Sequence, residues 1–242
     1  MRISIIICTC HFHTIKECLE SLLKVSDLEK ADAEVIIAMN GCELEARQYV
    51  ESLGPRFRYI WVDRRAGLCT MTNLAAKIAD GEYLVRLDDD AYLLEWGNNN
   101  LWLDWLLRPF LEDPMVGQSG PCLEAHPGGY VSLIGFLTMT KKEIWEKIGG
   151  LDTIFDPGGH EDKDYSMKVQ KLGYKVVSGT GDGSQMTPVE GLVSDLGFPI
   201  PFTANYPIYH ISRVDYNLPH DIHKKNEIIF KERYGFTGIY GK

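Results

Sequence analysis

Residues 82–93 read EYLVRLDDDAYL, a strand-like run followed by three consecutive aspartates, Asp88, Asp89 and Asp90. The run EYLVRL is short and mostly apolar, which is typical of a strand buried in a sheet. Three adjacent carboxylates raise each other's pKa unless positive charge lies between them. Clustered oxygen ligands at a strand end suit Mg²⁺ or Mn²⁺, and such ions commonly complete their coordination shell with substrate phosphates. The stretch therefore indicates a metal and phosphate site, with a solvated acidic turn as the alternative.

The residues before this stretch alternate strands with helices. Three apolar, β-branched runs, ISIIIC, EVIIAM and YIWV, predict strands, and each is followed by apolar residues at helical spacing. The strands are expected at Ile3–Cys8, Glu34–Met39 and Tyr59–Val62, and the helices at residues 14–23, 44–53 and 68–79. The sequence Thr14-Ile15-Lys16-Glu17 reads as a capping box at the start of the first helix. This alternation predicts an α/β fold with a doubly wound, mainly parallel (Rossmann-like) sheet and helices on both faces. Ligands of such sheets bind beyond the carboxyl ends of the strands, where the aspartates are expected.

The second half of the chain has a less regular pattern. Residues 101–114 predict a helix that is apolar on more than one face and therefore buried. Residues 130–140 look like a strand, and Thr140-x-x-Glu143 looks like the cap of a short helix. A helix is expected from about Glu161 to Leu172, ended by Gly173 and followed by another strand.

A long segment, residues 178–205, is rich in Gly, Pro, Ser and Thr and shows no clear periodicity. A loop of this length inside a compact domain is usually a functional lid or is disordered. Beyond it, residues 224–235 predict a terminal helix. Because no internal repeat or linker is visible, residues 1–242 are expected to form one domain.

The composition limits the function classes. With 45% hydrophobic and 24% charged residues, the 242-residue chain can bury a full core. It has 25 Lys and Arg residues against 34 Asp and Glu residues and no basic block, so no general nucleic-acid binding is expected. The six cysteines follow neither a disulfide framework nor zinc-ligand spacing, which favours reduced thiols and a cytoplasmic location. No stretch approaches the roughly 18 apolar residues of a transmembrane segment, and the N-terminal run is too short for a signal peptide.

A second candidate site lies at Gly158-Gly159-His160-Glu161-Asp162. Carboxylates in the first turn of a helix complement its dipole, so capping alone could explain them. The two glycines favour a ligand instead, because they let the backbone approach it closely. His210 follows the long loop and is either a metal ligand or a structural histidine. His11 and His13 follow the first strand, at the same sheet edge as the aspartates.

In combination, these segments resemble the family 2 glycosyltransferases of the GT-A fold. The resemblance runs from Ile3 to Gly235 and includes LDDDAYL, GGLD, GHEDKDYSMKVQKLGYKV and KERYG in that order. In that family the aspartate cluster is the DxD motif, which holds a divalent cation that bridges the two phosphates of a nucleotide-sugar. The resemblance implies that Asp90 is a direct metal ligand, that Asp88 faces the metal or the ribose, and that Asp89 belongs to the donor site.

The same resemblance assigns roles to residues outside the cluster. The family's ED motif matches Glu161-Asp162, which implies that Asp162 is the general base and that Glu161 helps to order the acceptor. Many relatives have a histidine late in the domain as a third metal ligand, and His210 is the candidate here. Gly67 and Asn73 match the family's Gly and Asn after the third strand, in the donor site.

The chain departs from the family pattern after its first two strands. Many members have Pro-x-Tyr-Asn after the first strand, and here Thr9 and Cys10 take this place in the donor site. Met39 stands where many members have an Asp that reads uracil, and a thioether cannot accept that hydrogen bond as a carboxylate would. The donor could therefore be a GDP-, dTDP- or CDP-sugar, or a UDP-sugar held by groups such as Arg65 or Asp63.

These features predict a metal-dependent, inverting glycosyltransferase that uses Mn²⁺ or Mg²⁺ and moves a sugar from a nucleoside-diphosphate sugar to an acceptor hydroxyl. Residues 1–94 are expected to bind the nucleotide, and residues 95–242, including the C-terminal helix, the acceptor. The acceptor could be a saccharide, a lipid-linked sugar or another hydroxyl compound, and no pattern indicates the oligomeric state. A sugar nucleotidyltransferase is one alternative, although the chain lacks its Gly-rich, Lys/Arg-bearing phosphate loop. A non-catalytic nucleotide-sugar-binding module is the other, although both acidic motifs are present.

Overall fold

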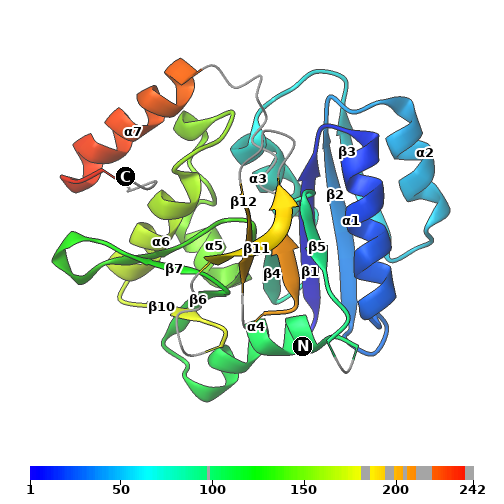
Figure 1. The fold of residues 1–242 in the computed structure, drawn as a ribbon, viewed down its shortest axis with the longest axis horizontal. Helices are drawn as coiled ribbons and strands as arrows, with labels where there is room; N and C mark the ends of the chain where they lie inside the picture. The colour runs from blue at the N-terminus through cyan, green and yellow to red at the C-terminus, as the bar shows by residue number, and fades with distance from the viewer. Residues whose placement is uncertain (97–98, 181–185, 194–198, 204–205, 211–219, 238–242) are drawn as a thin grey trace.

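A computed structural model describes residues 1–96, 99–180, 186–193, 199–203, 206–210 and 220–237 (Figure 1). Its centre is a seven-stranded sheet in the order β10-β6-β9-β4-β1-β2-β3. Neighbouring strands are parallel except where β9 pairs with β4 and with β6. The strands are β1 (Ile3–Thr9), β2 (Ala33–Asn40), β3 (Phe57–Val62), β4 (Tyr83–Leu87), β6 (Val116–Gly120), β9 (Leu137–Lys141) and β10 (Lys175–Ser178). The predicted doubly wound, mainly parallel sheet is confirmed.

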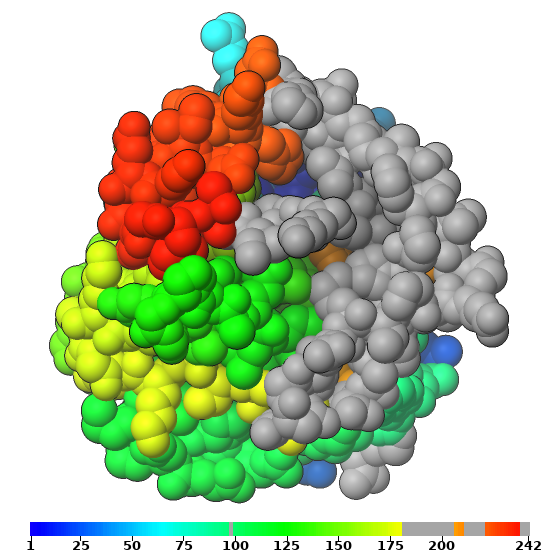
Figure 2. All heavy atoms as spheres, turned by 60° about the vertical axis from the view of Figure 1, so that its left-hand side comes forward, coloured from blue at the N-terminus to red at the C-terminus, as the bar shows by residue number. Residues whose placement is uncertain are grey.

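Helices cover both faces of this sheet, as predicted. The helices are α1 (Phe12–Val25), α2 (Leu44–Ser52), α3 (Leu68–Ile78), α4 (Leu101–Glu112), α5 (Lys142–Ile148), α6 (Glu161–Lys171) and α7 (His220–Tyr234). Side chains of a strand alternate between its two faces, so Ile5 and Ile7 pack with α1, α2 and α4, whereas Ile6 packs with α3. The helices α5, α6 and α7 form a further cluster that contains the fully buried Phe230. In Figure 2 the orange and red atoms of α7 lie against the green and yellow atoms of the second half of the chain.

The order of the strands reverses at β1, because β2 and β3 lie on one side of it and β4 on the other. In doubly wound sheets, ligands bind in the crevice that opens at such a point, beyond the carboxyl ends of the strands. Here β1 ends at Thr9, and β4 ends at Leu87, immediately before Asp88. The predicted position of the three aspartates at this edge is confirmed.

A second, smaller sheet has the order β11-β12-β13-β5. Its strands are β11 (Met186–Val193), β12 (Pro199–Thr203), β13 (Ile208–His210) and β5 (Ala91–Leu93). The prediction of a loop without secondary structure over residues 178–205 is therefore wrong for β11 and β12. Their sequences have no clear strand period, and antiparallel pairing with each other and with β13 supplies their hydrogen bonds instead. Residues 181–185, 194–198 and 204–205 of this segment lie outside the described residues, as do residues 97–98.

Both predicted capping boxes are wrong. Thr14 lies inside the first turn of α1, which follows His11 and has no side-chain cap. Its hydroxyl donates to Asp89 Oδ2 and to the carbonyl of His11. Thr140 belongs to β9, and its hydroxyl donates to the carbonyl of Gly117. In each case a partner distant in sequence takes the hydroxyl that a local cap would use.

The remaining predictions for the second half hold with shifted limits. The predicted helix over residues 101–114 is α4, and it is buried on two faces through Trp102, Leu103, Leu106 and Phe110. The predicted strand over residues 130–140 is split into β8 (Val131–Leu133) and β9, with β7 (Leu123–Ala125) pairing to β8. Short 3-10 turns follow at Pro127–Gly129 and Thr153–Phe155. None of the helices in the described ranges has the length and apolar character needed to cross a membrane.

Candidate metal and catalytic site

A long-range strand pair creates the acidic centre. β5 and β13 pair antiparallel with His210 opposite Ala91, so this distant histidine lies beside the residues that follow β4. Asp88, Asp90 and His210 each offer one ligand atom, and these atoms all lie within 4.8 Å of one another. His210 Nε2 lies 3.2 Å from Asp90 Oδ1, and the two side chains are only 12% and 11% exposed. Across the described residues, this is the one cluster of His, Cys, Asp or Glu side chains close enough to share a metal ion.

The donor set of this group fits a divalent cation. Two carboxylates and one imidazole suit Mn²⁺, and the carboxylates suit Mg²⁺ as well. The ring of His210 stacks on Phe136 with centroids 4.5 Å apart, which fixes its plane. Its Nδ1 is buried and has no hydrogen-bond partner among the described residues. Burial lowers the pKa of His210, but the charge and hydrogen bond of Asp90 outweigh this effect and raise the pKa overall.

Asp89, the middle aspartate, accepts hydrogen bonds from two threonine hydroxyls. Its Oδ2 lies 2.6 Å from Thr9 Oγ1 and 2.8 Å from Thr14 Oγ1. These contacts tie the end of β1 and the first turn of α1 to the loop after β4. Burial and the neighbouring charge of Asp90 raise the pKa of Asp89 to about 7, against the lowering effect of the two hydrogen bonds. A donor contact of Asp89 or Thr9 stays a prediction, and both residues shape this edge of the sheet.

We expect Asp89→Ala to lower the free energy of unfolding by roughly 1–3 kcal/mol, because two partly buried hydroxyls lose their acceptor. Asp89→Asn retains an acceptor oxygen and should lose less than half of that amount. Urea denaturation followed by fluorescence measures both. An Ala variant with the wild-type urea midpoint would show that the tie between β1, α1 and the aspartate loop contributes no stability.

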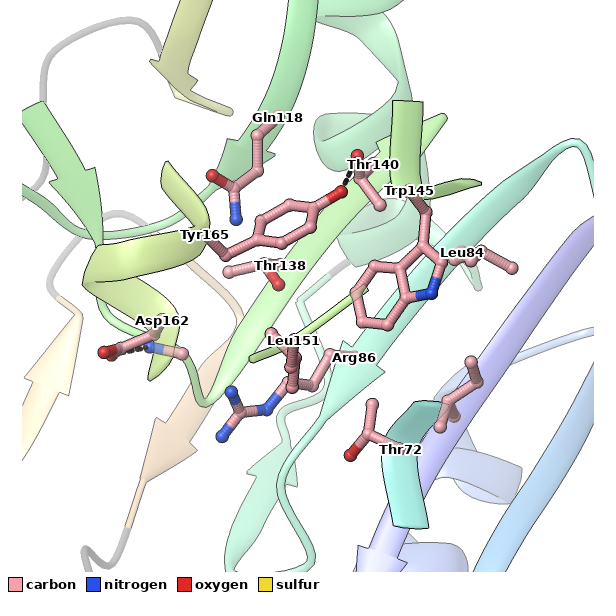
Figure 3. Close-up of a pocket in the computed structure, with 12 residues that line it drawn as sticks. Thr72, Leu84, Arg86, Gln118, Thr138, Thr140, Trp145, Leu151, Asp162 and Tyr165 are labelled. Carbon is pink, nitrogen blue, oxygen red and sulfur yellow. Dashed lines mark hydrogen bonds between the residues drawn. The ribbon is translucent and has the colours of Figure 1, made fainter. Parts of the chain in front are cut away.

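The two carboxylates of the ED motif lie at the start of α6 and have separate partners. Glu161 Oε1 lies 2.9 Å from Arg86 Nη1, and its Oε2 accepts a 2.6 Å hydrogen bond from the amide of Gly159. Asp162 Oδ2 accepts a 2.9 Å hydrogen bond from the amide of Gly135, drawn in Figure 3, and its Oδ1 accepts one from the amide of Lys163 at 2.8 Å. Both side chains are almost fully buried, so their charges are weakly screened by water.

The environment of Asp162 suits a general base. Burial and the nearby charge of Glu161 raise the pKa of Asp162 to about 7, although Arg86 and Lys163 lower it. A carboxylate of ordinary pKa is a weak base, and a base works best when its pKa lies near the operating pH. Capping of α6 is not the explanation for Asp162, because one of its oxygens binds an amide outside the helix.

The C-terminal helix holds the loop that precedes the ED motif. Asn226 Nδ2 in α7 donates to the carbonyls of Phe155 and Gly158 at 2.8 and 2.9 Å. Arg233 Nη1 lies 2.8 Å from both Asp152 Oδ2 and Asp164 Oδ1. The helix itself is predicted by the sequence, but these contacts are not, because nothing in the local pattern pairs residue 226 with residue 158.

Arg86 is a residue of this candidate site that sequence reasoning missed. Its Nε lies 3.1 Å from Asp88 Oδ1 and its Nη1 lies 2.9 Å from Glu161 Oε1, with only 10% of the side chain exposed. The alternation of a strand places Arg86 on the same face as residue 88, and this spacing was a signal in the sequence. The glutamate on the other side could not be inferred, because it lies 75 positions away.

Three other predicted donor-site residues differ in exposure. Cys10 is partly buried at the end of β1, and Arg65 is exposed with its Nη2 3.2 Å from His11 Nε2. Met39 is fully buried in the main core cluster. Cys10 and Arg65 are therefore accessible at the ligand edge of the sheet, whereas the Met39 side chain offers no surface to a nucleotide base. His13 pairs with Glu17 on α1 at 3.2 Å.

Asn73 has a backbone partner in the GGLD segment. Its Nδ2 donates to the carbonyl of Leu151 at 2.7 Å, and its Oδ1 accepts from the amide of the same residue at 2.9 Å. A Cβ at Gly150 would lie 2.3 Å from Asn73 Oδ1, so the pair requires glycine there. The predicted donor contact of Asn73 stays a prediction, and its observed contact holds the chain that leads to the ED motif.

Gly67 lets a distant carboxylate cap α3. Asp156 Oδ1 accepts a hydrogen bond from the amide of Cys69 at 2.7 Å, and its Oδ2 accepts from the hydroxyl of Thr70 at 2.6 Å. Gly67 has φ +101°, and a Cβ there would lie 2.3 Å from Asp156 Cγ. The predicted donor contact of Gly67 is also untested, and the observed role is to admit the cap.

Gly67→Ala should lower the free energy of unfolding by roughly 2–5 kcal/mol, since a positive φ costs about 1–3 kcal/mol for alanine and loss of the Asp156 cap costs about 1–2 kcal/mol. Gly54→Ala is the matched control, because Gly54 has φ +99° but no atom within 4 Å of its Cβ position. The difference between the two unfolding free energies measures the clash with Asp156. Equal losses would mean that the cap adjusts without cost.

The first comparison with known proteins is at the level of sequence. Residues 4–96 match the family described as Glycosyl transferase family 2. A stretch of 58 residues is 41% identical to WcaA of Escherichia coli (strain K12), which is named as a colanic acid biosynthesis glycosyl transferase. The aligned stretch covers 24% of this chain and 20% of WcaA, so the chain spans only a small part of that relative.

The second comparison is at the level of structure. The mannosyltransferase PcManGT from Pyrobaculum calidifontis, solved with GDP-Man and Mn²⁺, superimposes with a TM-score of 0.59 at 22% identity over 73% of this chain and 54% of that chain. GalNAc-T7, solved with UDP, GalNAc and Mn²⁺, superimposes with a TM-score of 0.62 at 15% identity over 74% and 42%. At these identities the likeness establishes a shared α/β fold.

Proposed function

We propose that this chain, whose residues 4–96 match Glycosyl transferase family 2, is a metal-dependent, inverting enzyme that moves a sugar from a nucleoside-diphosphate sugar to an acceptor hydroxyl. The observation that most supports this proposal is the meeting of two acidic groups at one sheet edge. Asp88, Asp90 and His210 are close enough to share a metal ion, and Asp162, the neighbour of Glu161, is buried and has a raised pKa. Arg86 contacts both groups.

In the proposed reaction, Asp88, Asp90 and His210 would hold a divalent cation, which would supply positive charge to the leaving diphosphate when bound. Asp162 accepts the proton of the acceptor hydroxyl as that oxygen attacks the anomeric carbon. The bond from this carbon to the diphosphate oxygen breaks while the bond to the acceptor oxygen forms on the opposite face. One displacement therefore inverts the configuration. The exposed Arg65 would add charge stabilisation at the diphosphate.

We assign donor binding to residues 1–94 and acceptor binding to residues 95–242. The carboxyl ends of β1 and β4 belong to the first part, and the match to the family ends close to this limit, at residue 96. The ED motif, α7 and the β7–β8 hairpin belong to the second. The solved relatives bind GDP-Man and UDP, and the buried Met39 offers no carboxylate to a uracil. The donor nucleotide proposed first is therefore GDP, with dTDP, CDP and UDP as the others, and the acceptor is a saccharide, a lipid-linked sugar or another hydroxyl compound.

Calorimetric titration with GDP, UDP, CDP and dTDP, each with and without Mn²⁺, tests this proposal directly. Selective binding of one diphosphate that requires Mn²⁺ is the expected result, and it would identify the donor nucleotide. Binding of none, or binding that ignores Mn²⁺, would contradict a diphosphate and metal site at the aspartates. A sugar screen with the matching nucleotide-sugars, read as diphosphate release, then identifies the donor.

A further inference from the structure

A buried arginine joins the candidate metal ligands Asp88, Asp90 and His210, here called the metal group, to the ED motif. Arg86 contacts Asp88 through Nε and Glu161 through Nη1, at 3.1 and 2.9 Å. A guanidinium is a planar fork with its donors at fixed angles, so one arginine can hold two carboxylates at a fixed separation. Since Arg86 and Glu161 are only 10% and 5% exposed, water screens this pair weakly.

A two-residue segment of backbone makes a second connection between the same groups. The amide of Gly135 donates to Asp162 Oδ2 at 2.9 Å. The carbonyl of the next residue, Phe136, accepts from the amide of Asp88 at 2.8 Å, and its ring stacks on His210. Adjacent residues therefore contact two members of the metal group on one side and Asp162 on the other.

Gly135 packs closely against the side chains of Arg86 and Asp162, so the two connections are in contact with each other. A Cβ at Gly135 would lie 2.8 Å from Arg86 Nη1 and 2.9 Å from Asp162 Cβ. Figure 3 shows the guanidinium end of Arg86 turned toward the side of the pocket on which Asp162 lies. Any residue larger than glycine at position 135 must displace one of these side chains.

We propose that Arg86 and Gly135 are positioning residues that hold Asp162 and Glu161 at a fixed distance from Asp88, Asp90 and His210. Both act through the carboxylates. Asp162 is then held in position relative to the leaving diphosphate before an acceptor binds. Less entropy is therefore lost when the acceptor is ordered for the reaction. This inference rests on the proposed function, because it concerns the geometry of that site.

Arg86→Gln removes the fork and leaves Glu161 buried without its cationic partner. The ED loop should shift, and a misplacement of this kind costs about 100-fold in kcat. The donor KM should change much less, because Asp90 and His210 remain. The double variant, Arg86→Gln with Glu161→Gln, removes the buried charge that the single variant leaves at Glu161, so it should fold even where the single variant does not.

Gly135→Ala tests the same proposal without altering any charge. It should lower kcat as Arg86→Gln does, because the added methyl group pushes the side chains of Arg86 and Asp162 apart. Arg58→Gln is the matched control at the amino ends of the strands. Arg58 Nη1 also bridges two carboxylates, Glu34 at 2.8 Å and Asp80 at 3.0 Å, and its loss should leave kcat and the ED loop unchanged.

The experiment uses the full chain with Mn²⁺ alone as the first probe, followed by GDP-, UDP-, CDP- and dTDP-sugars. Three quantities are measured for each variant: Mn²⁺ affinity by calorimetry, amide hydrogen exchange of residues 158–164 with Mn²⁺ present, and diphosphate release. The proposal expects exchange about tenfold faster in Arg86→Gln and Gly135→Ala than in the wild type, lower kcat in both, nearly unchanged Mn²⁺ affinity in Gly135→Ala, and no effect in Arg58→Gln.

Wild-type exchange and kcat in both Gly135→Ala and the Arg86 and Glu161 double variant would overturn the inference while leaving the proposed function intact. A wild-type protein that neither binds Mn²⁺ nor releases a diphosphate would overturn the proposed function itself, and the inference with it. Equal effects in Arg58→Gln would also overturn the inference, because they would show a general loss of stability.

Discussion

Asp90→Asn is expected to weaken Mn²⁺-dependent binding of the donor diphosphate by about 100-fold or more, since even removal of a residue that only supports a metal ligand typically costs 10–100-fold. Asp90 Oδ1 lies 3.2 Å from His210 Nε2, and the ligand atoms of Asp88, Asp90 and His210 all lie within 4.8 Å of one another. The substitution therefore removes a negative charge from the centre of this group. An amide oxygen is neutral and binds a divalent cation more weakly than a carboxylate. Calorimetry with Mn²⁺ and the diphosphate measures the loss.

The control for this prediction is Asp113→Asn. Asp113 pairs with Lys175 at 2.7 Å near the amino ends of β6 and β10, far from the carboxyl edge of the sheet. The same change of charge there should leave Mn²⁺ and diphosphate binding as in the wild type. If Asp90→Asn bound the diphosphate as the wild type does with Mn²⁺ present, the cation would have to lie elsewhere, and His210 would be a structural partner of Asp90.

The fold follows from the sequence wherever strands bury both faces. Continuous apolar runs such as Ile3–Cys8 define parallel strands, and their order places the aspartates at the ligand edge. The second sheet does not follow, because β11 and β12 contain Pro and Gly, and the sheet joins the aspartate loop only through the long-range pair of β13 with β5. The two capping boxes fail for a related reason, since Thr14 and Thr140 meet partners that no local pattern contains.

The site is predictable in its residue types but only partly in its connections. The metal group of Asp88, Asp90 and His210 can be expected from the sequence, although its third member depends on the pairing of β13 with β5. The pairing of Arg86 with Glu161 could not be assigned, because the two residues are distant in the chain. Asn73 has a motif position that suggests ligand binding, whereas its observed contact is to the backbone of another loop. The position of a residue in a family motif thus indicates that the residue belongs to the site, but it does not show which atoms the residue contacts.

Asp162→Asn is expected to lower kcat for sugar transfer by about 1000-fold, within the 10²–10⁴ range of general base catalysis. The amide oxygen of asparagine can still accept the hydrogen bond from Gly135, so the loop should keep its place. Mn²⁺-dependent diphosphate binding is the internal control and should be unchanged, because Asp162 does not belong to the metal group. Transfer at the wild-type rate would remove Asp162 as the base.

The pH dependence gives an independent test of the same residue. A base must be ionised to act, so kcat/KM should rise tenfold per pH unit below the pKa of Asp162 and become level above it. Burial and Glu161 raise this pKa to about 7, whereas Arg86 lowers it. A bound cation adds positive charge and lowers it further, so the bend should lie at or below about pH 7. Glu161→Gln removes a raising charge and should move the bend to lower pH, whereas Arg86→Gln removes a lowering charge and should move it to higher pH. A bend that stays in place in both variants would mean that a group other than Asp162 sets the profile.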